Sequence, residues 1–219
     1  MPNLPDPIAL LGIVLLLGLA PFAAIMVTSY TKLVIVFGLL RSALGVPQVP
    51  PNMVLNAIAI ILSVYVMAPI GMSANQVLQQ SGMLNRSLTT RDLLAVADAV
   101  KNPMHEFLMH HTTQHERQFF LKSAQSLWPK AQAAQLSQDD FIVVVPAFTV
   151  SEITKAFQIG FVLYMMFVVV DLIVGTVLLM LGMSMISPTT VSVPFKLLLF
   201  VSLDGWSRLI HALVLSYRV

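Results

Sequence analysis

Four of the five histidines lie within one polar stretch of the chain, at His105, His110, His111 and His115. His111 and His115 are four residues apart, so a single helix would place them on one face, at a spacing that suits metal ligands. The glutamate that directly follows the first histidine in zinc-dependent proteases is absent, because Thr112 occupies that position. We therefore interpret these histidines as part of a solvated helix face and predict no metal site.

The possible nucleophiles do not form a recognisable catalytic motif. The chain contains no cysteine, which excludes thiol catalysis, disulfides and cysteine-based zinc sites. It contains no Gly-x-Ser-x-Gly elbow, Walker loop or dinucleotide fingerprint. An intramembrane serine site could in principle be built from Ser63, Ser73, Ser151 and His211, but serine is a common packing residue of membrane helices. We therefore predict no enzymatic activity and no bound cofactor.

Five charged residues interrupt otherwise apolar stretches: Glu152, Lys155, Asp171, Lys196 and Asp204. Charges in apolar surroundings are costly, so they usually pair or line a pathway. Glu152 and Lys155 are three residues apart and can meet on one helix face. Asp171 needs a distant partner, and the alternatives are Lys196, a neighbouring subunit, or a neutral carboxyl group. A proton or ion relay would show several acids in series, so we favour a role in helix packing and assembly.

Methionines form a further signal near a helix break. Met180, Met183 and Met185 cluster with Gly182 and Ser184. Methionine is flexible and polarizable, so such a cluster could act as an adaptable seal where two helices meet at a constriction. The alternative is ordinary packing in a core or against lipid.

These residues belong to a chain of 219 residues that is 57% apolar and only 10% charged. Ordinary soluble domains are roughly 45–50% apolar and about 25% charged. The composition therefore argues against a soluble enzyme domain. It argues more firmly against intrinsic disorder, because disordered chains have low hydrophobicity and high net charge. The formal net charge of +2 is too small to indicate a nucleic-acid partner.

The charges are distributed unevenly along the chain. A run of 25 uncharged residues ends before Lys32 and another of 44 ends before Arg86, whereas residues 86–140 hold twelve charges, six of each sign. This pattern predicts three parts. Residues 1–85 form N-terminal hydrophobic helices, residues 86–140 form a polar helical insert, and residues 141–219 form C-terminal hydrophobic hairpins.

Four hydrophobic segments are expected to form helical arms: Ile8–Val27, Met53–Leu78, Phe157–Ser187 and Phe195–Val214. A bilayer-spanning helix needs about 20 mostly apolar residues, which the first two segments provide. The first reads as an uncleaved segment rather than a signal peptide, because no Lys or Arg precedes it. The third, with 31 residues, is too long for a simple span, so it is either one long tilted helix or a buried helical hairpin.

Prolines and charges predict the breaks between these arms. Pro188 and Pro194 bracket the gap before the fourth arm, where we expect helix to end. Asp204 and Arg208 interrupt the fourth arm itself. A rigid structural corner after the first arm contains Pro47, Pro50, Pro51 and Asn52. The chain is thus predicted to be an all-α membrane protein of long, kinked hydrophobic helical hairpins with an amphipathic helical insert.

The connection from Thr28 to Asn52 gives a clue to orientation. It carries Lys32 and Arg41 and no acid, so the positive-inside rule places it on the cytoplasmic side and the polar insert on the periplasmic side.

Within the insert, local signals predict helix boundaries. Asn102 and Pro103 indicate an N-cap followed by the first helical residue. Trp128 and Pro129 close a helix, and Ser137 with Asp140 begins the next one.

Several motifs together resemble the SctR/FliP family of type III secretion export-apparatus proteins. They run nearly end to end, and only the polar insert lacks clear family marks. The matching stretches are Thr28–Lys32, Leu39–Gly45, Val49–Asn52, Pro146–Glu152, Ala156–Phe161, Gly182–Pro188, Pro194–Phe200 and Asp204–Trp206. The SctR branch is closer than the flagellar one, since Trp128, Pro129 and His211 recur in it.

The resemblance implies a non-enzymatic role. Members assemble into a homo-oligomeric ring, pentameric in known relatives, together with SctS-like and SctT-like proteins. The complex forms the portal for unfolded substrate proteins at the bacterial inner membrane. Its apolar hairpins pack against one another largely above the bilayer plane, so the assembled core is displaced toward the periplasm. The fold would then be completed by oligomerisation, with protein neighbours satisfying the buried charges.

The resemblance also assigns a role to the methionine cluster. The family's methionine loop is a gasket that closes the pore, and its usual Gly-Met-Met-Met-Val corresponds here to Gly182–Ile186. Met183 and Met185 are the candidate gasket residues, with Met180 beside them, whereas Ser184 replaces the middle methionine. The alternative function is an ion- or proton-coupled transporter subunit, which would be expected to show inverted repeats and an acidic pathway.

Overall fold

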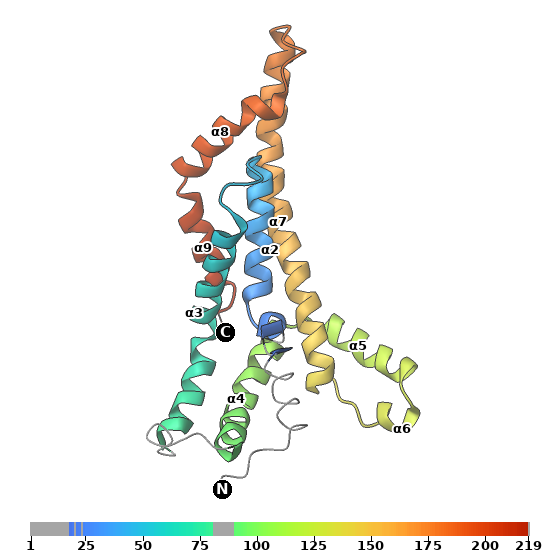
Figure 1. Ribbon diagram of the computed structural model, residues 1–219. Coiled ribbons are helices and arrows are strands. Elements are labelled where there is room, and N and C mark those ends of the chain that lie inside the picture. Colours follow the sequence, from blue (N-terminus) through green and yellow to red (C-terminus); the bar gives the residue numbers. More distant parts are fainter. Residues whose placement is uncertain (1–17, 20, 23, 81–89, 219) are drawn as a thin grey trace.

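The computed structural model describes residues 18–19, 21–22, 24–80 and 90–218, and every regular element within them is a helix (Figure 1). The helices are α2 (Tyr30–Leu44), α3 (Asn52–Gln80), α4 (Thr90–His111), α5 (Gln114–Leu127), α6 (Lys130–Ala133), α7 (Phe141–Met180), α8 (Pro188–Ser202) and α9 (Gly205–Leu215). The predicted all-α fold class is confirmed. The first predicted arm, Ile8–Val27, lies in large part outside the described residues.

The first helix of the polar insert is longer than its sequence signals indicated. α4 continues through Pro103, so the predicted helix start at Asn102 is wrong. A proline inside a helix removes one backbone hydrogen bond. Here the turns on both sides of Pro103 belong to a helix that packs against α3 and α7, and this packing keeps the helix continuous.

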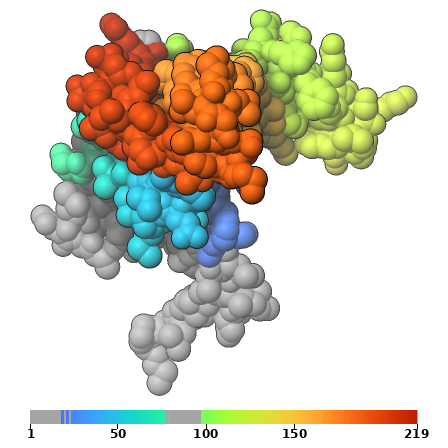
Figure 2. All heavy atoms as spheres, turned by 90° about the horizontal axis from the view of Figure 1, so that it is seen from above, coloured from blue at the N-terminus to red at the C-terminus, as the bar shows by residue number. Residues whose placement is uncertain are grey.

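The rest of the insert forms an arm that leaves the body of the molecule. α5 ends at Leu127, directly before Trp128 and Pro129, as predicted, and the short α6 follows. Figures 1 and 2 show both helices projecting sideways from the lower end of α7, on the side away from α3. We call residues Gln114–Ala133 the arm.

α7 is one helix of 40 residues that begins directly after Asp140, as predicted. At a rise of 1.5 Å per residue it is roughly 60 Å long, about twice the thickness of a bilayer hydrocarbon core. Of the two alternatives for Phe157–Ser187, the structure shows the long helix, which ends at Met180 before a loop. Asp140 supports the start of the helix, because its Oδ2 accepts a hydrogen bond from the Ser137 backbone N–H at 2.7 Å.

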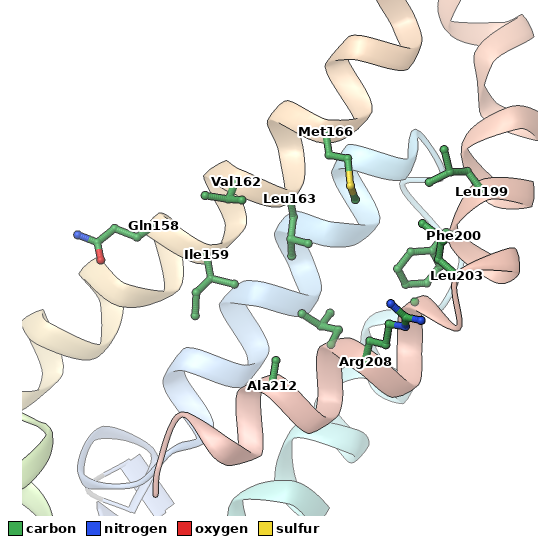
Figure 3. Close-up of a pocket in the computed structure, with 12 residues that line it drawn as sticks. Gln158, Ile159, Val162, Leu163, Met166, Leu199, Phe200, Leu203, Arg208 and Ala212 are labelled. Atoms are coloured by element: carbon green, nitrogen blue, oxygen red, sulfur yellow. The ribbon is translucent and has the colours of Figure 1, made fainter.

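The chain returns along α7 as a bent pair of helices. α8 begins at Pro188 and continues through Pro194, so the prediction that helix ends between these prolines is wrong. Pro188 starts the helix because the first helical position needs no N–H donor. The predicted break at Asp204 is confirmed, since this residue has φ 52° and α8 and α9 meet there at 62°. The pair leaves an apolar groove of about 570 Å³ along α7, with Arg208 among its lining residues (Figure 3).

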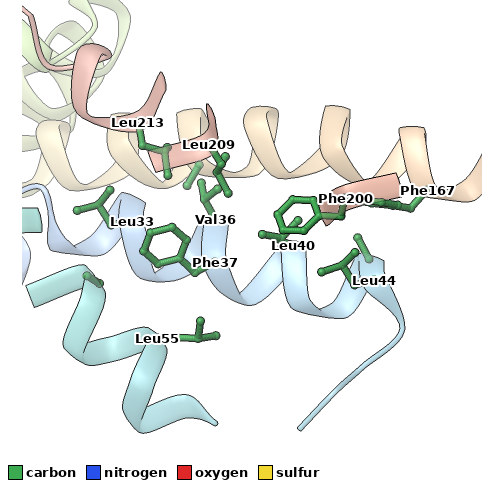
Figure 4. Close-up of a cluster of buried hydrophobic side chains, with 13 residues drawn as sticks. Leu33, Val36, Phe37, Leu40, Leu44, Leu55, Phe167, Phe200, Leu209 and Leu213 are labelled. Atoms are coloured by element: carbon green, nitrogen blue, oxygen red, sulfur yellow. The ribbon is translucent and has the colours of Figure 1, made fainter. Parts of the chain in front are cut away.

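The main hydrophobic core is centred on α2. Leu33, Val36, Phe37 and Leu40 are fully buried, and their spacing of three or four residues places them on one stripe of the helix. They pack against apolar side chains of α3, α7, α8 and α9 (Figure 4), which include Leu55, Phe167, Phe200, Leu209 and Leu213. Each element of the hydrophobic body thus buries one side against α2.

The interpretation of Thr28–Asn52 as a short connection is wrong, because this segment contains α2. The segment contains a 15-residue helix in the centre of the molecule, and only residues 45–51 form the connection to α3. Lys32 suggested a loop because it interrupts an apolar run, yet its side chain is buried. The positive-inside rule concerns charges beside membrane spans that are not buried in protein, and Lys32 is buried and paired. Of the two basic residues, only Arg41 therefore still supports the inferred orientation.

Two of the described helices are long and apolar enough to cross a membrane: Asn52–Gln76 within α3, and α7. The bent pair of α8 and α9 would make a third if it counts as one broken span. Most side chains of α3 and α7 within these stretches are not buried by the chain itself. Their apolar surface therefore requires lipid or protein partners.

The structural corner between α2 and α3 depends on a left-handed glycine. Gly45 has φ +78°, and its N–H donates to the Ser42 carbonyl at 3.1 Å, which ends α2. Arg41 Nη1 then donates to the Pro50 carbonyl at 3.1 Å, which holds the turn against the helix end. The remaining corner residues follow, and α3 begins at Asn52 directly after Pro51. A Cβ atom at Gly45 would lie 2.8 Å from Val193 Cγ2 of α8, so the corner also contacts the returning helix.

We predict that Gly45→Ala lowers the free energy of unfolding by about 1–2 kcal/mol, because a side chain disfavours the left-handed conformation and this one also meets Val193. The matched control is Gly38→Ala, where nothing lies within 4 Å of the new Cβ. That change should be neutral or stabilise the helix by about 0.5–1 kcal/mol. Thermal unfolding of the two purified variants in detergent measures the difference, and equal stabilities would contradict the prediction.

Candidate functional site

The carboxylate of Glu152, on α7, is fully buried and has two ammonium partners. Lys32 Nζ lies 3.2 Å from Oε2, and Lys155 Nζ lies 3.2 Å from Oε1. The pairing of Glu152 with Lys155 that the sequence allowed is therefore formed. Lys32, from α2, adds a second and more deeply buried cation.

Tyr217, which follows α9, reaches the same carboxylate. Its hydroxyl donates a hydrogen bond to Glu152 Oε2 and lies 3.4 Å from the carbonyl oxygen of Ser29. Lys32 Nζ lies 3.5 Å from the centre of the Tyr217 ring, a cation–π contact. Sequence reasoning missed both residues: Lys32 was assigned to the connection between two arms, and no local pattern distinguishes Tyr217 from other tyrosines.

Lys155 also connects this carboxylate to the polar insert. Its Nζ donates to the His111 carbonyl oxygen, at the end of α4, at 2.5 Å. One turn earlier on α7, Ser151 Oγ accepts a hydrogen bond from the Thr113 backbone N–H at 3.1 Å. The junction between α4 and α5 is therefore fixed to α7 beside Glu152.

The buried surroundings change the protonation equilibria of three groups near the carboxylate. Burial lowers the pKa of the Lys32 ammonium, and the charge of Glu152 opposes this effect. Burial raises the pKa of the Tyr217 hydroxyl, and Glu152 raises it further. Burial also lowers the pKa of His111 to about 4. Tyr217 is therefore a hydrogen-bond donor and His111 is neutral near pH 7.

The position of His111 corrects the interpretation of the histidines. The residue is only 4% exposed and its ring packs against the rings of Phe107 and Tyr217, so it does not lie on a solvated face. α4 ends at His111 and α5 begins at Gln114, so His111 and His115 do not share a helix face. Among the described residues, no three His, Cys, Asp or Glu side chains form a group that could hold a metal ion.

A second ion pair lies farther along α7. Lys196 Nζ, from α8, lies 2.7 Å from Asp171 Oδ2 and also donates to the Ala43 carbonyl at 3.1 Å. Ser192 Oγ donates to the other Asp171 oxygen. Of the three alternatives for Asp171, the structure forms the pair with Lys196. A single lysine thus joins α8 to α7 and to the end of α2.

The two ion pairs are separate along the helix. Glu152 and Asp171 are 19 residues apart on α7, which corresponds to roughly 28 Å. Asp204 is exposed in the break between α8 and α9 and joins neither ion pair. A relay needs groups within reach of one another, so this arrangement favours the structural role for the charges over proton transfer.

The methionine loop joins α7 to α8 at the far end of the molecule (Figure 1). Gly182 has φ +71°, and the N–H groups of Gly182 and Met183 donate to the Leu179 and Leu178 carbonyls at 3.1 and 2.9 Å. These two bonds form a Schellman motif, which ends the helix in a fixed direction.

The methionines and the serine that carried the gasket prediction are exposed in this loop. Met185 is 97% exposed, and Met180, Met183 and Ser184 are exposed as well. The structure therefore presents flexible apolar side chains at the tip of its longest hairpin, where no other part of the described chain covers them.

Comparisons with known proteins show which family the sequence belongs to. The sequence model of the family described as "FliP family" matches residues 13–213. The chain belongs to the FliP family. Members of this family are non-enzymatic membrane components of type III secretion export apparatus, and the chain is an export-apparatus protein of this kind.

Individual relatives match over almost their full length. The chain is 54% identical over 202 residues to "Hypersensitivity response secretion protein HrcR" of Ralstonia nicotianae, which covers 92% of this chain and 93% of the relative. It is 49% identical over 218 residues to "Yop proteins translocation protein R" of Yersinia pestis, with 99% of both chains covered. A protein of Xanthomonas campestris pv. glycines described as "Pathogenicity-related ORF2" is 54% identical over 209 residues, 95% of this chain and 96% of the relative.

For this FliP-family chain, we predict that Glu152→Gln lowers the free energy of unfolding by about 3–5 kcal/mol, because it leaves the buried Lys32 without a counter-charge. Adding Lys32→Met should restore part of the loss, since it removes the uncompensated ammonium. The control is Asp139→Asn, which breaks the exposed pair with Arg117 at 3.4 Å and should change stability by less than about 1 kcal/mol. Chemical unfolding in detergent measures the stability of the single variant, the double variant and the control. If Glu152→Gln lowered the free energy of unfolding no more than the control does, a structural role for Glu152 and its partners would be refuted.

The lowered pKa of His111 predicts that the stability of the folded chain depends on pH. The pKa of His111 is about 4 when folded and about 6.5 in an unfolded chain, so between these values the unfolded state binds more protons. The free energy of unfolding should therefore fall as the pH is lowered from about 6.5 toward 4, with a limiting slope near 1.4 kcal/mol per pH unit from this residue. His111→Phe should reduce the slope, whereas the exposed control His115→Gln should retain it. Identical slopes for wild type and His111→Phe, measured at pH 7.5, 6 and 5, would contradict this.

Proposed function

We propose that this chain forms a homo-oligomeric ring, pentameric as in known relatives, which lines and seals the portal for unfolded substrate proteins at the bacterial inner membrane. The main support is the exposed methionine loop at the tip of the α7–α8 hairpin. Copies arranged around a central axis would bring Met183 and Met185 of each subunit together. Their side chains can repack around varied substrate surfaces, because methionine has three flexible torsions and no branch.

The apolar surface of α7 supports assembly with sister subunits. Exposed large apolar side chains occur from Ile142 to Met180, along nearly the whole helix. The helix is roughly 60 Å long, whereas the hydrocarbon core of a bilayer is about 30 Å thick. Lipid alone therefore covers only part of this surface, and protein neighbours are needed for the remainder.

The partners proposed from the family are SctS-like and SctT-like proteins, which would complete the helical core together with the ring. We place the insert, residues 86–140, on the periplasmic side and the assembled core displaced toward the periplasm. Within this proposal Glu152, Lys155, Asp171 and Lys196 support assembly indirectly, because their ion pairs fix the helices that present the contact surfaces. Asp204, exposed at the bend between α8 and α9, is available to a neighbouring subunit.

We predict that the double variant Met183→Ala, Met185→Ala raises ion leakage through the inner membrane while the complex still assembles. The shorter side chains would leave an opening at the constriction, because alanine removes most of the apolar volume that fills it. The measurement is membrane conductance or ion-dependent growth inhibition, with complex yield followed on native gels.

The control for this prediction is Met166→Ala, because Met166 is also exposed but lies within α7, away from the loop. It should not change conductance. An unchanged conductance in the double variant, with normal complex yield, would remove the sealing role from these methionines.

A further inference from the structure

The arm carries exposed apolar and basic side chains. Leu127 is 79% exposed, and Phe119 and Trp128 are exposed as well. The exposed Lys122 and Lys130 beside them form no ion pair with a carboxylate of the described chain. A projecting element with Trp, Phe and Lys at its surface has the composition of a docking element, since aromatic side chains dominate the energetic centres of protein interfaces.

A groove of about 730 Å³ lies between α3 and α4. Its apolar lining includes Val66 and Ile70 from α3 and Phe107 and Met109 from α4, and Ser73 lies on the α3 side. The volume lies within the range of about 300–1,000 Å³ that is typical of occupied pockets. The groove is therefore large enough to receive bulky side chains.

Charges on the groove complement those on the arm. Glu106, exposed on α4, belongs to the lining, and the exposed Asp98 lies two helical turns earlier on the same helix. Glu106 forms no ion pair with a side chain that the structure describes. Lys101, also exposed, lies between Asp98 and Glu106 on α4, so the acidic charge of the groove lining itself is that of Glu106. The arm presents basic residues around an apolar tip, and such complementarity specifies register between partners.

The arm and α3, which lines one side of the groove, lie on opposite sides of the molecule and near the same end of it. Figures 1 and 2 show the arm on one side of the lower part and α3 on the other, in two views at right angles. A surface on one side that fits a different surface on the other side makes a head-to-tail contact, and repetition of that contact around an axis closes a ring.

We propose that the arm of one copy docks into the α3–α4 groove of the next copy. Leu127 and Trp128 occupy the groove, and the basic side chains of the arm, Lys122 and Lys130, lie beside Glu106. The proposal rests on the ring described under the proposed function, and it names the surfaces that join neighbouring subunits on the insert side.

Disulfide cross-linking tests this contact directly, because the natural chain contains no cysteine. Leu127→Cys and Ser73→Cys are introduced into the same full-length chain, which is expressed with its export-apparatus neighbours and oxidised in isolated membranes. A head-to-tail contact gives a ladder of linked species that stops at the closed ring. Coexpression of the two single variants gives linked dimers but no longer ladder, because each copy then has one reactive side.

Two controls separate this contact from the ring itself. Leu127→Cys alone and Ser73→Cys alone should each give no linked species, because a head-to-tail contact brings Leu127 of one copy only to Ser73 of the next. Native gels of the same membranes report the oligomer independently. A normal oligomer without the Leu127–Ser73 cross-link overturns the docking proposal and leaves the ring standing, whereas absence of any oligomer overturns both.

A charge exchange provides a second readout that needs no cysteine. Glu106→Lys should lower the yield of the oligomer several-fold, because it opposes like charges across the contact. Lys122→Glu with Lys130→Glu should restore part of the yield when combined with Glu106→Lys. A loss of yield that the reversed arm does not relieve, in membranes where the chain itself accumulates normally, would contradict the pairing.

Discussion

The buried carboxylate of Glu152 holds together parts of the chain that are far apart in sequence. It forms ion pairs with Lys32 of the central helix and Lys155 of its own helix, and it accepts a hydrogen bond from the hydroxyl of Tyr217 in the C-terminal segment. A carboxylate without these partners would be strongly destabilising at a fully buried position. The core around α2, the α4–α5 junction and the segment after α9 therefore depend on one another.

This constraint explains why a chain with so few charges buries several of them. The apolar body contains many helices with similar hydrophobic surfaces, and apolar contacts alone specify register weakly. Ion pairs have one correct arrangement each, because an unpaired partner is penalised. Glu152 with Lys32, and Asp171 with Lys196, fix α2, α7 and α8 relative to one another. The remaining apolar surface is then presented outward in a defined arrangement.

The sequence was sufficient for the helical class, the break at Asp204 and the helix end before Trp128, because composition and local capping signals determine these features. It did not predict α2, because Lys32 suggested a connection between arms. The burial of this lysine depends on a carboxylate 120 residues later in the chain, which no local pattern indicates. The helix boundaries predicted at Pro103 and Pro194 were wrong for a related reason, because tertiary packing keeps both helices continuous. Tyr217 and the inward position of His111 depend entirely on contacts between distant segments, which a single sequence does not display.

The length of α7 has a mechanical consequence. One uninterrupted helix carries the methionine loop at one end and the attachment of the arm near the other, and it is fixed to α2 at Glu152. The segment from Glu152 to Met180 extends roughly 42 Å, whereas the arm is attached within one turn of Glu152. Because Asp171 and Lys196 fix the same helix again farther along, α7 cannot bend freely between these two ion pairs. A displacement of the arm would therefore be transmitted to the methionine loop, so rigidity, rather than flexibility, links the two ends of the molecule.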